Sequence, residues 1–256
     1  MSFLLGPTGR LNSWRNSVGT TWHTCLASGT WPLSLVIDEV ADMNRWPWKE
    51  VFLARHGETV WNREKRRQGR LDSPLTEAGI ENAEQVAELV AGMAPDRLYS
   101  SPLGRARATA EIVGRRLGIP ATVVDDLAEI DHGEVGGLTN AEIEELFPGL
   151  AERRRADKYR FRFPGGESYA DADVRARRSW GAVHGARPLI VTHEMVGRML
   201  IRNLLGIEPA EALRWNHPHG TVLRFDMVTR RVVLVSSEGS REVFAYGATI
   251  LSRASN

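Results

Sequence analysis

The sequence contains very little cysteine, lysine or net charge, and each scarcity excludes a class of function. Cys25 is the single cysteine among 256 residues, which rules out an intramolecular disulfide and a cysteine-rich metal site. The formal net charge is +1, so no bulk electrostatic attraction to nucleic acid or to a membrane surface is expected. Only Lys49, Lys65 and Lys158 are lysines. Arginine binds phosphate bidentately, but a GC-rich genome would give the same arginine excess, and we favour that explanation.

Long hydrophobic runs are also absent. No apolar stretch approaches the roughly 18 to 20 residues that a helix needs to span a bilayer. The content of hydrophobic residues is 42%, and that of charged residues is 25%, both ordinary for a globular protein. We therefore expect a soluble, cytoplasmic protein that has no membrane or nucleic-acid partner.

The first 46 residues differ in composition from the rest of the chain. Residues 1–37 contain no acidic residue, and five of the eight tryptophans precede residue 50 without periodicity. An acid-free, serine-rich start is typical of organellar transit peptides, but a mis-assigned start, with the protein beginning near Met43, has the same pattern and is the interpretation we favour. We expect residues 1–46 to be disordered or spurious, and residues 47–250 to form the domain.

From Trp48 onward, segments with strand and helix character alternate. Apolar runs predict strands over residues 51–54, 97–100, 121–124 and 188–192, and a terminal hairpin over 221–225 and 231–235. Capping residues predict helices that begin after Thr76, Ser101, Thr139 and Ser168. The first of these helices has an apolar face that starts at Ile80. Repeated βα units predict an α/β fold in which helices cover both faces of a mostly parallel central sheet.

Two of the predicted strands end on a histidine. The first runs into Arg55, His56 and Gly57, and the second runs into His193. Functional groups of α/β proteins lie at the carboxyl ends of the strands, so we expect the two histidines to lie close together. Either histidine alone would more often be a structural residue. Two such strand ends, with arginines to match, favour a site that binds an anion.

The stretch from Arg55 to Asn62 resembles the signature of the histidine phosphatase superfamily, which includes the cofactor-dependent phosphoglycerate mutases. Arg55-His56-Gly57 alone would be a weak match, but the pattern continues in order from residue 49 to about residue 236. Its further parts are Gln68-Gly69, Asp72-Ser73-Pro74-Leu75-Thr76, Gly79, Ser101-Pro102-Leu103-Gly104-Arg105-Ala106, Thr109-Ala110, Glu129, Gly133, Gly166-Glu167-Ser168 and His193. The resemblance implies a phosphoglycerate mutase-like fold, a three-layer αβα sandwich.

The resemblance also implies roles for particular residues. His56 would attack phosphorus and form a phosphohistidine. Glu129 would protonate the leaving oxygen and later deprotonate the attacking water; since it follows two aspartates, the alternative is an acidic surface turn. The catalytic set is then His56, Glu129, His193 and Arg55, and the phosphate-binding set is Arg55, Asn62, Arg105 and His193.

These observations predict a metal-independent phosphomonoester hydrolase, monomeric or homodimeric, that acts on a small phosphorylated metabolite without a cofactor. The alternative is a cofactor-dependent phosphoglycerate mutase. The mutase pattern at the acid resembles Glu-Arg-x-Tyr-Gly, whereas this chain has Glu129-Ile130-Asp131-His132-Gly133. A non-catalytic phospho-ligand binder is expected to lack His56 or Glu129. A metal triad of His56, Glu129 and His193 is disfavoured because the neighbouring arginines would repel a cation.

Two positions depart from the family pattern. Gly136 and Gly137 replace a Glu-Gly pair, and Glu194 follows His193 where glycine is common. The carboxylate of Glu194 could raise the pKa of His193, or it could simply begin a helix where acids are favourable.

A basic segment and a histidine pair are less specific. Residues 153–162 carry five arginines and a lysine, which form either a solvated helix face, the commoner case, or a lid that recruits an anionic substrate. His217 and His219 flank Pro218, and for these we expect a loop role rather than metal binding.

Overall fold

The computed structural model describes residues 14–15, 21–22 and 46–245 of the chain. The chain divides into two compact units, Met1–Asp42 and Met43–Asn256. In the first unit, strands β1 (Trp14–Arg15) and β2 (Thr21–Trp22) pair in antiparallel fashion. The remaining positions of the segment 1–46, for which we expect disorder or a spurious origin, lie outside the described residues, apart from Trp46.

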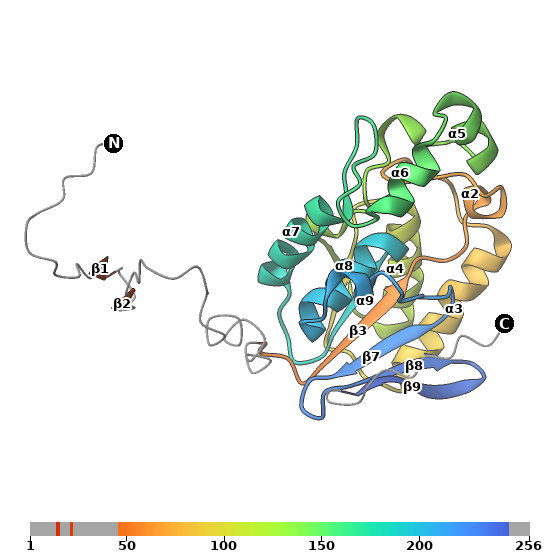
Figure 1. Cartoon of the computed structure of the whole chain (residues 1–256). Helices are drawn as coiled ribbons and strands as arrows, with labels where there is room; N and C mark the ends of the chain where they lie inside the picture. The colour runs from red at the N-terminus through yellow and green to blue at the C-terminus, as the bar shows by residue number, and fades with distance from the viewer. Residues whose placement is uncertain (1–13, 16–20, 23–45, 246–256) are drawn as a thin grey trace, which may run out of the picture. The chain divides into compact units, whose positions relative to one another are not determined.

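The second unit is built on a seven-stranded sheet with the order β5-β4-β6-β3-β7-β8-β9. Figure 1 labels β3, β7, β8 and β9 of this sheet. Strands β5, β4, β6 and β3 pair in parallel, as the alternating strands and helices predict. Strands β7, β8 and β9 extend the sheet in antiparallel fashion, so that the whole sheet is mixed. The strands are β3 (Glu50–Arg55), β4 (Arg97–Ser100), β5 (Ala121–Val123), β6 (Pro188–Thr192), β7 (Val222–Asp226), β8 (Arg231–Ser236) and β9 (Gly239–Ala245).

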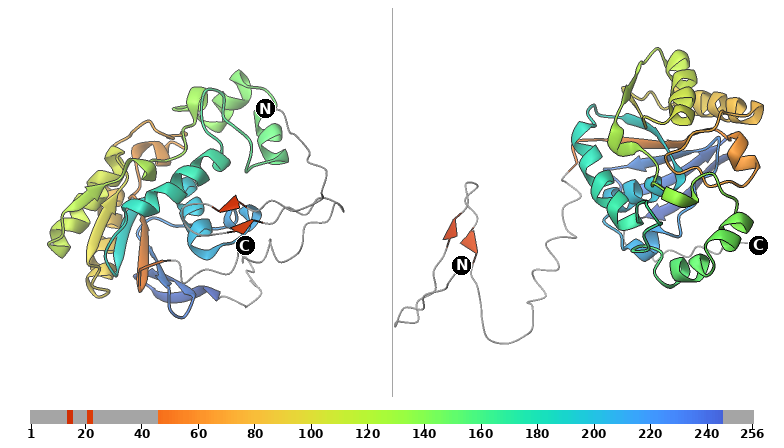
Figure 2. Two further views of the ribbon diagram at one scale, coloured as in Figure 1. Left: turned by 90° about the vertical axis from the view of Figure 1, so that its left-hand side faces the viewer. Right: turned by 90° about the horizontal axis from the view of Figure 1, so that it is seen from above.

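Helices cover both faces of this sheet (Figure 2). Because side chains alternate along a strand, Val51 and Leu53 of β3 pack with α7 and α8, while Phe52 and Ala54 pack with α3 and α4. The predicted three-layer αβα sandwich is therefore confirmed. The helices are α2 (Val60–Arg63), α3 (Glu77–Ala91), α4 (Gly104–Leu117), α5 (Asn140–Leu146), α6 (Leu150–Ala156), α7 (Tyr169–Ser179), α8 (Glu194–Leu205) and α9 (Pro209–Ala212), with short 3-10 turns η2 (Asp125–Leu127), η3 (Gly133–Val135) and η4 (Trp180–Ala182). Across the described residues, no helix combines the length and the hydrophobicity that crossing a membrane requires.

Most helix boundaries follow the predicted caps, but three expectations were wrong. Helix α4 begins at Gly104 with Leu103 as its N-cap, because the hydroxyl of Ser101 contacts His193 as well as the amide of Leu103. Ile80, predicted on the apolar face of α3, is 44% exposed. The hairpin of β7 and β8 is not terminal, since β9 pairs with β8.

Two glycines allow the end of β3 to approach α3 very closely. A Cβ atom on Gly57 would lie 2.0 Å from the carbonyl oxygen of Gly79, and a Cβ atom on Gly79 would lie 2.0 Å from that of Glu58. The amide of Gly57 also donates to Oγ1 of Thr109 in α4, at 3.0 Å. Backbone contacts with two helices thus fix the residue that follows His56.

Candidate active site

The carboxyl ends of β3 and β6 bring two histidines together. Arg55 is in register with Thr192, so His56 and His193 follow neighbouring strand ends. Their ring centroids are 5.1 Å apart, at an interplanar angle of 57°. The amide of His56 donates to the carbonyl oxygen of Thr192 at 3.0 Å, which continues the ladder one residue beyond β3.

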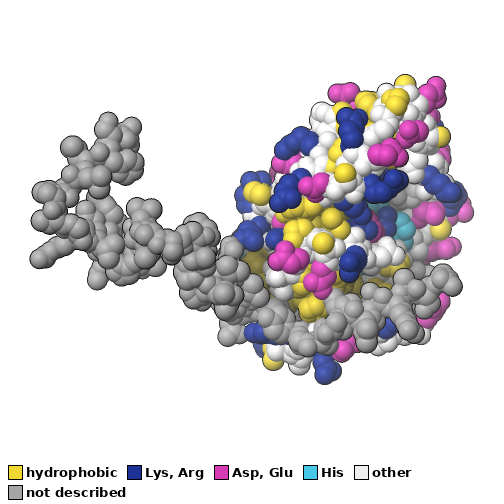
Figure 3. Space-filling view, in the orientation of Figure 1, with side chains coloured by type: hydrophobic (Ala, Val, Ile, Leu, Met, Phe, Trp, Pro, Cys, Tyr) yellow, Lys and Arg dark blue, Asp and Glu magenta, His cyan; other side chains and the backbone are white. Residues whose placement is uncertain are grey.

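A cavity of about 240 Å³ opens at these strand ends. Its lining includes Arg55, His56, Asn62, Arg105 and Glu129 of the predicted site, while His193 lies against His56. The remaining lining residues are Arg66, Arg67, Gln68, Gly69, His132, Arg154, Tyr169, Glu194, Met195 and Arg198. Arginines thus outnumber carboxylates in the lining, which suits an anionic ligand. Figure 3 shows histidine atoms in a hollow among dark-blue basic side chains.

The hydrogen bonds of His56 define which ring nitrogen can react. Nδ1 lies 2.8 Å from the carbonyl oxygen of Gly57, and a carbonyl can only accept, so Nδ1 carries the proton. Nε2 then holds a lone pair, which accepts from Nε–H of Arg105 at 3.3 Å. The imidazole is 3% exposed. Burial and the nearby guanidinium groups of Arg105 and Arg55 hold the pKa of His56 well below 6.5, so the ring is neutral at physiological pH.

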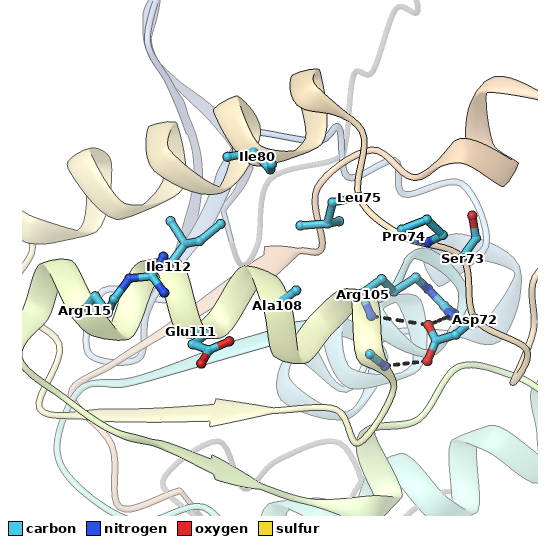
Figure 4. Close-up of a pocket in the computed structure, with 11 residues that line it drawn as sticks. Asp72, Ser73, Pro74, Leu75, Ile80, Arg105, Ala108, Glu111, Ile112 and Arg115 are labelled. Atoms are coloured by element: carbon cyan, nitrogen blue, oxygen red, sulfur yellow. Dashed lines mark hydrogen bonds and ion pairs between the residues drawn. The ribbon is translucent and has the colours of Figure 1, made fainter.

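Asp72 holds Arg105 in place (Figure 4). Nη1 of Arg105 donates to Oδ1 of Asp72 at 2.9 Å and to the carbonyl oxygen of Leu71 at 2.8 Å, and Nη2 donates to the carbonyl oxygen of Gly69 at 2.8 Å. Asp72 also accepts from the backbone amides of Gly104 and Arg105 at the start of α4. The loop before α3 and the first turn of α4 therefore fix this guanidinium together.

Arg55 is held by a carboxylate and a carbonyl group. Its Nη1 donates to Oε2 of Glu194 at 2.6 Å and to the carbonyl oxygen of His217 at 3.2 Å. Burial lowers the pKa of Arg55, against the opposing effect of Glu194. Its buried Nε has no hydrogen-bond partner within the described part of the chain. Such an unused donor on a cavity wall can bind an anion.

A capping interaction orients Asn62. Its side-chain Oδ1 accepts from the amide of Thr59 at 3.1 Å and lies 3.0 Å from the hydroxyl of Thr59, which is the N-cap of α2. The oxygen is therefore engaged, and the amide nitrogen remains as the donor toward the cavity.

Glu129 lies in the cavity wall and not on an acidic surface turn. It is 6% exposed, whereas Asp125 of the preceding turn is exposed. Its Oε1 accepts from the amides of Ile130 and Val196 at 2.9 and 2.8 Å, and its Oε2 accepts from the amide of Met195 at 3.0 Å. The carboxyl group thus lies at the N-terminus of α8, within hydrogen-bond distance of its first backbone amides.

The expectation that Glu194 could raise the pKa of His193 was wrong. Glu194 is the first residue of α8, and its carboxylate binds Arg55 and Arg198, each at 2.6 Å. Burial, together with the charge of Arg105, holds the pKa of His193 well below 6.5. Nε2 of His193 lies 2.7 Å from the hydroxyl of Ser101. Glu194 therefore begins the helix at a position where an acid is favourable, which is the second of the two alternatives that the sequence offers.

Several residues of the site were not singled out from the sequence. Asp72 and Ser101 belong to the quoted motif segments, so their positions in the motif were an available signal. Nδ1 of His219 lies 2.6 Å from the carbonyl oxygen of His56, and its ring lies 5.5 Å from that of His56; no sequence pattern indicated this contact.

His217 is buried with Nε2 3.3 Å from the carbonyl oxygen of Thr221, which agrees with the predicted loop role. Within the described ranges, no group of three or more His, Cys, Asp or Glu side chains could hold a metal ion.

Comparisons with known proteins agree on one family. Residues 51–238 match the histidine phosphatase superfamily (branch 1). A relative from Salmonella paratyphi C, named "Probable phosphoglycerate mutase GpmB", is 36% identical over 169 residues, which cover 64% of this chain and 78% of the relative. The solved mycobacterial glucosyl-3-phosphoglycerate phosphatase in complex with VO3 is 26% identical, covers 78% of this chain and 100% of its own, and has a TM-score of 0.64. The alpha-ribazole phosphatase from Shigella flexneri shares the fold at 22% identity, with a TM-score of 0.64 over 80% of this chain and 99% of its own.

Proposed function

The chain belongs to branch 1 of the histidine phosphatase superfamily, and from this premise we propose that it is a metal-independent phosphomonoester hydrolase that works through a phosphohistidine on His56. The observation that carries the proposal is the state of His56. Its Nδ1 proton is bound by the carbonyl group of Gly57, and its pKa is held low by burial and by the charges of Arg105 and Arg55. An unprotonated Nε2 therefore faces an arginine-lined cavity at physiological pH.

In the first step, Nε2 of His56 attacks phosphorus, and the bond from phosphorus to the ester oxygen breaks. The departing oxygen takes a proton from Glu129. Arg55, Arg105 and Asn62 donate to the phosphoryl oxygens, on which charge spreads in the transition state. The neutral imidazole of His193, against the ring of His56, supplies a further donor to the same group.

In the second step, water replaces the alcohol. Glu129, now a carboxylate, takes a proton from water as the oxygen attacks phosphorus, and the bond from Nε2 to phosphorus breaks. Phosphate leaves, Glu129 again carries a proton and His56 is again neutral. No metal ion or organic cofactor enters either step.

The names of the relatives point to two acceptors for the phosphoryl group. The Salmonella relative is named a probable mutase, whereas the mycobacterial and Shigella proteins are named phosphatases. We favour water as the acceptor, because this chain has Ile130-Asp131-His132 where mutases resemble Arg-x-Tyr after the catalytic acid.

The test is to trap the covalent intermediate. Incubation with a small phosphomonoester, followed by acid and base treatment, should give a phosphoenzyme that is labile in acid and stable in base. His56→Ala should abolish both this adduct and turnover, while His184→Ala, which alters an exposed histidine, should retain both. Turnover without an adduct on rapid quenching would contradict the mechanism. Formation of 2-phosphoglycerate from 3-phosphoglycerate faster than phosphate release would favour the mutase.

A further inference from the structure

Four basic side chains gather at or beside the cavity, apart from the groups that contact His56. We call them the outer basic cluster: Arg67, Arg154, Lys158 and Arg198. Arg67, Arg154 and Arg198 line the cavity, and Lys158 lies with its Nζ 6.0 Å from the ring centroid of the cavity residue Tyr169. Arg154 and Lys158 belong to the basic segment 153–162, whose charges suggest either a solvated helix face or a lid over the site.

Burial separates the basic residues of that segment into two groups. Arg154 and Lys158 are partly buried, whereas Arg153, Arg155, Arg160 and Arg162 are exposed. The exposed Arg155, Arg160 and Arg162 each pair with an acid, Glu152, Asp157 and Asp171 respectively. The segment is therefore a solvated face on one side, and only Arg154 and Lys158 turn toward the site.

The outer basic cluster lacks sufficient counter-charge. Among the residues that the structure describes, Arg67, Arg154 and Lys158 form no ion pair, and Arg67 donates only to the neutral side chain of Asn140, at 3.0 Å. Arg198 pairs with Glu194 at 2.6 Å, but the same carboxylate also binds Arg55. Arg198 and Arg55 thus share the carboxylate of Glu194.

The pKa values of Arg67, Arg154 and Lys158 reflect burial and this crowding, whereas Tyr169 and Glu194 raise the pKa of Arg198 against the effect of burial. Burial and the charge of Arg198 lower the pKa of Arg154, and burial together with Arg198 and Arg154 lowers that of Lys158. Burial and Arg154 likewise lower the pKa of Arg67. Mutual repulsion of this kind is relieved when an anion binds between the cations.

Tyr169 adds a neutral donor at the same place. The side chain is 2% exposed, and its hydroxyl oxygen accepts from Nη1 of Arg198 at 2.8 Å. The described residues provide no acceptor for the hydroxyl proton. Buried hydroxyl groups normally donate as well as accept, so this proton is available to a ligand in the cavity.

We propose that the outer basic cluster and Tyr169 form a second anion site, and that the substrate is a phosphate monoester with a second anionic group, a carboxylate or a second phosphate. The inference rests on the proposed function and names the substrate class of the same site. The ester phosphate binds between Arg55 and Arg105 beside His56, and the second anion binds between Arg67, Arg154 and Tyr169. Both anion sites lie in the same cavity of about 240 Å³, so one small molecule can reach both.

Matched substrates test the proposal. 3-Phosphoglycerate and glycerol 3-phosphate share a carbon skeleton and differ in one carboxylate; fructose 1,6-bisphosphate and fructose 6-phosphate differ in one phosphate. We expect kcat/KM to be at least about tenfold higher for the doubly anionic member of one pair, since a hydrogen bond to a charged group contributes this much. The pair that shows the preference identifies the second anion as a carboxylate or a phosphate.

Two variants test whether Arg154 produces the preference for the doubly anionic substrate. Arg154→Gln should reduce that preference about tenfold, mainly through KM, whereas Arg153→Gln, an exposed neighbour on α6, should leave it unchanged. Circular dichroism of both variants checks folding. Equal kcat/KM values within each pair, or an Arg154→Gln variant with an undiminished preference, would overturn the proposal.

Calorimetry separates this inference from the proposed function. Titration of 3-phosphoglycerate and glycerol 3-phosphate into His56→Ala, with and without Arg154→Gln, compares affinities without turnover. A protein that hydrolyses no ester, but binds the acid more tightly through Arg154, contradicts the phosphatase and retains the second anion site. A protein that hydrolyses both esters, and binds them equally, retains the phosphatase and rejects the second site.

Discussion

At the scale of single residues, Arg105 connects three parts of the site that are separate in the sequence: His56, Asp72 and the start of α4. It contacts the proposed nucleophile His56, it is bound by Asp72, and it belongs to the first turn of α4. The contact from its Nε to Nε2 of His56 measures 3.3 Å, which is long for a hydrogen bond from a charged donor. In the proposed mechanism this weak bond is exchanged for one to a phosphoryl oxygen, which frees the lone pair of His56 for attack.

Glu129 allows a test of proton transfer that does not depend on detecting an intermediate. Glu129→Gln removes the exchangeable proton but keeps the shape of the side chain. We expect kcat for an alkyl phosphate to fall by about 10² to 10⁴, because an alkoxide leaves poorly without a proton. For p-nitrophenyl phosphate, whose leaving group needs no proton, formation of the phosphoenzyme should slow much less. Rapid-quench kinetics with both substrates measures the difference.

Asp125→Asn is the control for this experiment, because it makes the same chemical change on the exposed turn just before Glu129. It should leave both rates unchanged. Equal losses for the two leaving groups in Glu129→Gln would indicate that Glu129 positions other groups and does not transfer a proton.

The sequence predicts the groups that face the cavity better than the groups that hold them. The histidines follow apolar runs, and parallel strand ends must meet at one edge, so the closeness of His56 and His193 could be deduced. The contact of His219 with the carbonyl group of His56 spans 163 residues, and it depends on the path of a loop. The ion pairs of Glu194 depend likewise on how Arg55 and Arg198 are oriented, which no spacing encodes.

At the scale of elements, the junction between β3 and α3 controls where His56 lies. Gly79→Ala would place a Cβ atom 2.0 Å from the carbonyl oxygen of Glu58. Because that neighbour is backbone, relief requires α3 to move away from the strand end. We expect a loss of about 2 kcal/mol or more in the free energy of unfolding, despite the gain in helix propensity. Urea unfolding followed by circular dichroism measures this loss.

Gly92→Ala provides the matched substitution at the other end of α3. Its backbone φ is −71°, and the nearest atom to an added Cβ lies 3.9 Å away. This variant should be neutral or slightly stabilised. If Gly79→Ala were as stable as Gly92→Ala, the close approach of strand and helix would not constrain the site.

The elements themselves were predicted where local signals dominate. Thr76 and Thr139 cap α3 and α5 as predicted, since an N-cap hydroxyl acts within four residues. The start of α4 was misplaced because Ser101 bonds to a histidine 92 residues away. Strand β9 was missed because several of its residues are exposed, so it lacks the apolar alternation that indicates a strand.

At the scale of the whole molecule, the near-zero net charge conceals a strong separation of charge. The formal charge is +1, yet the cavity lining contains Arg55, Arg66, Arg67, Arg105, Arg154 and Arg198 against Glu129 and Glu194. The composition predicts only that bulk attraction to polyanions is absent. Composition cannot predict a local cationic site, because the fold determines which arginines line the same cavity.

Buried neutral histidines should make the whole molecule sensitive to mild acid. The pKa values of His132 and His217 are lowered to about 3, mainly by burial, and those of His56 and His193 also lie well below 6.5. The unfolded chain binds protons below about pH 6.5, whereas the folded chain does not. The contribution of these neutral histidines to the stability of the fold is therefore complete above pH 6.5 and is lost as the pH falls toward 3. His132 and His217 each contribute a loss of about 2 kcal/mol between pH 7 and pH 5, and His56 and His193 add to it, so the loss is a large part of the stability of a typical domain.

We accordingly expect cooperative acid unfolding near pH 5, well above the range in which most carboxylates titrate. Urea unfolding followed by tryptophan fluorescence at several pH values between 5 and 8 gives the slope of stability against pH. His217→Gln removes one buried imidazole that does not line the cavity, and it should reduce that slope by about 1.4 kcal/mol per pH unit below pH 6. His184→Gln, at an exposed position, should leave the slope unchanged. A stability that stays constant from pH 7 to pH 5 would mean that these histidines accept protons in the folded protein, and it would remove the basis for a neutral His56.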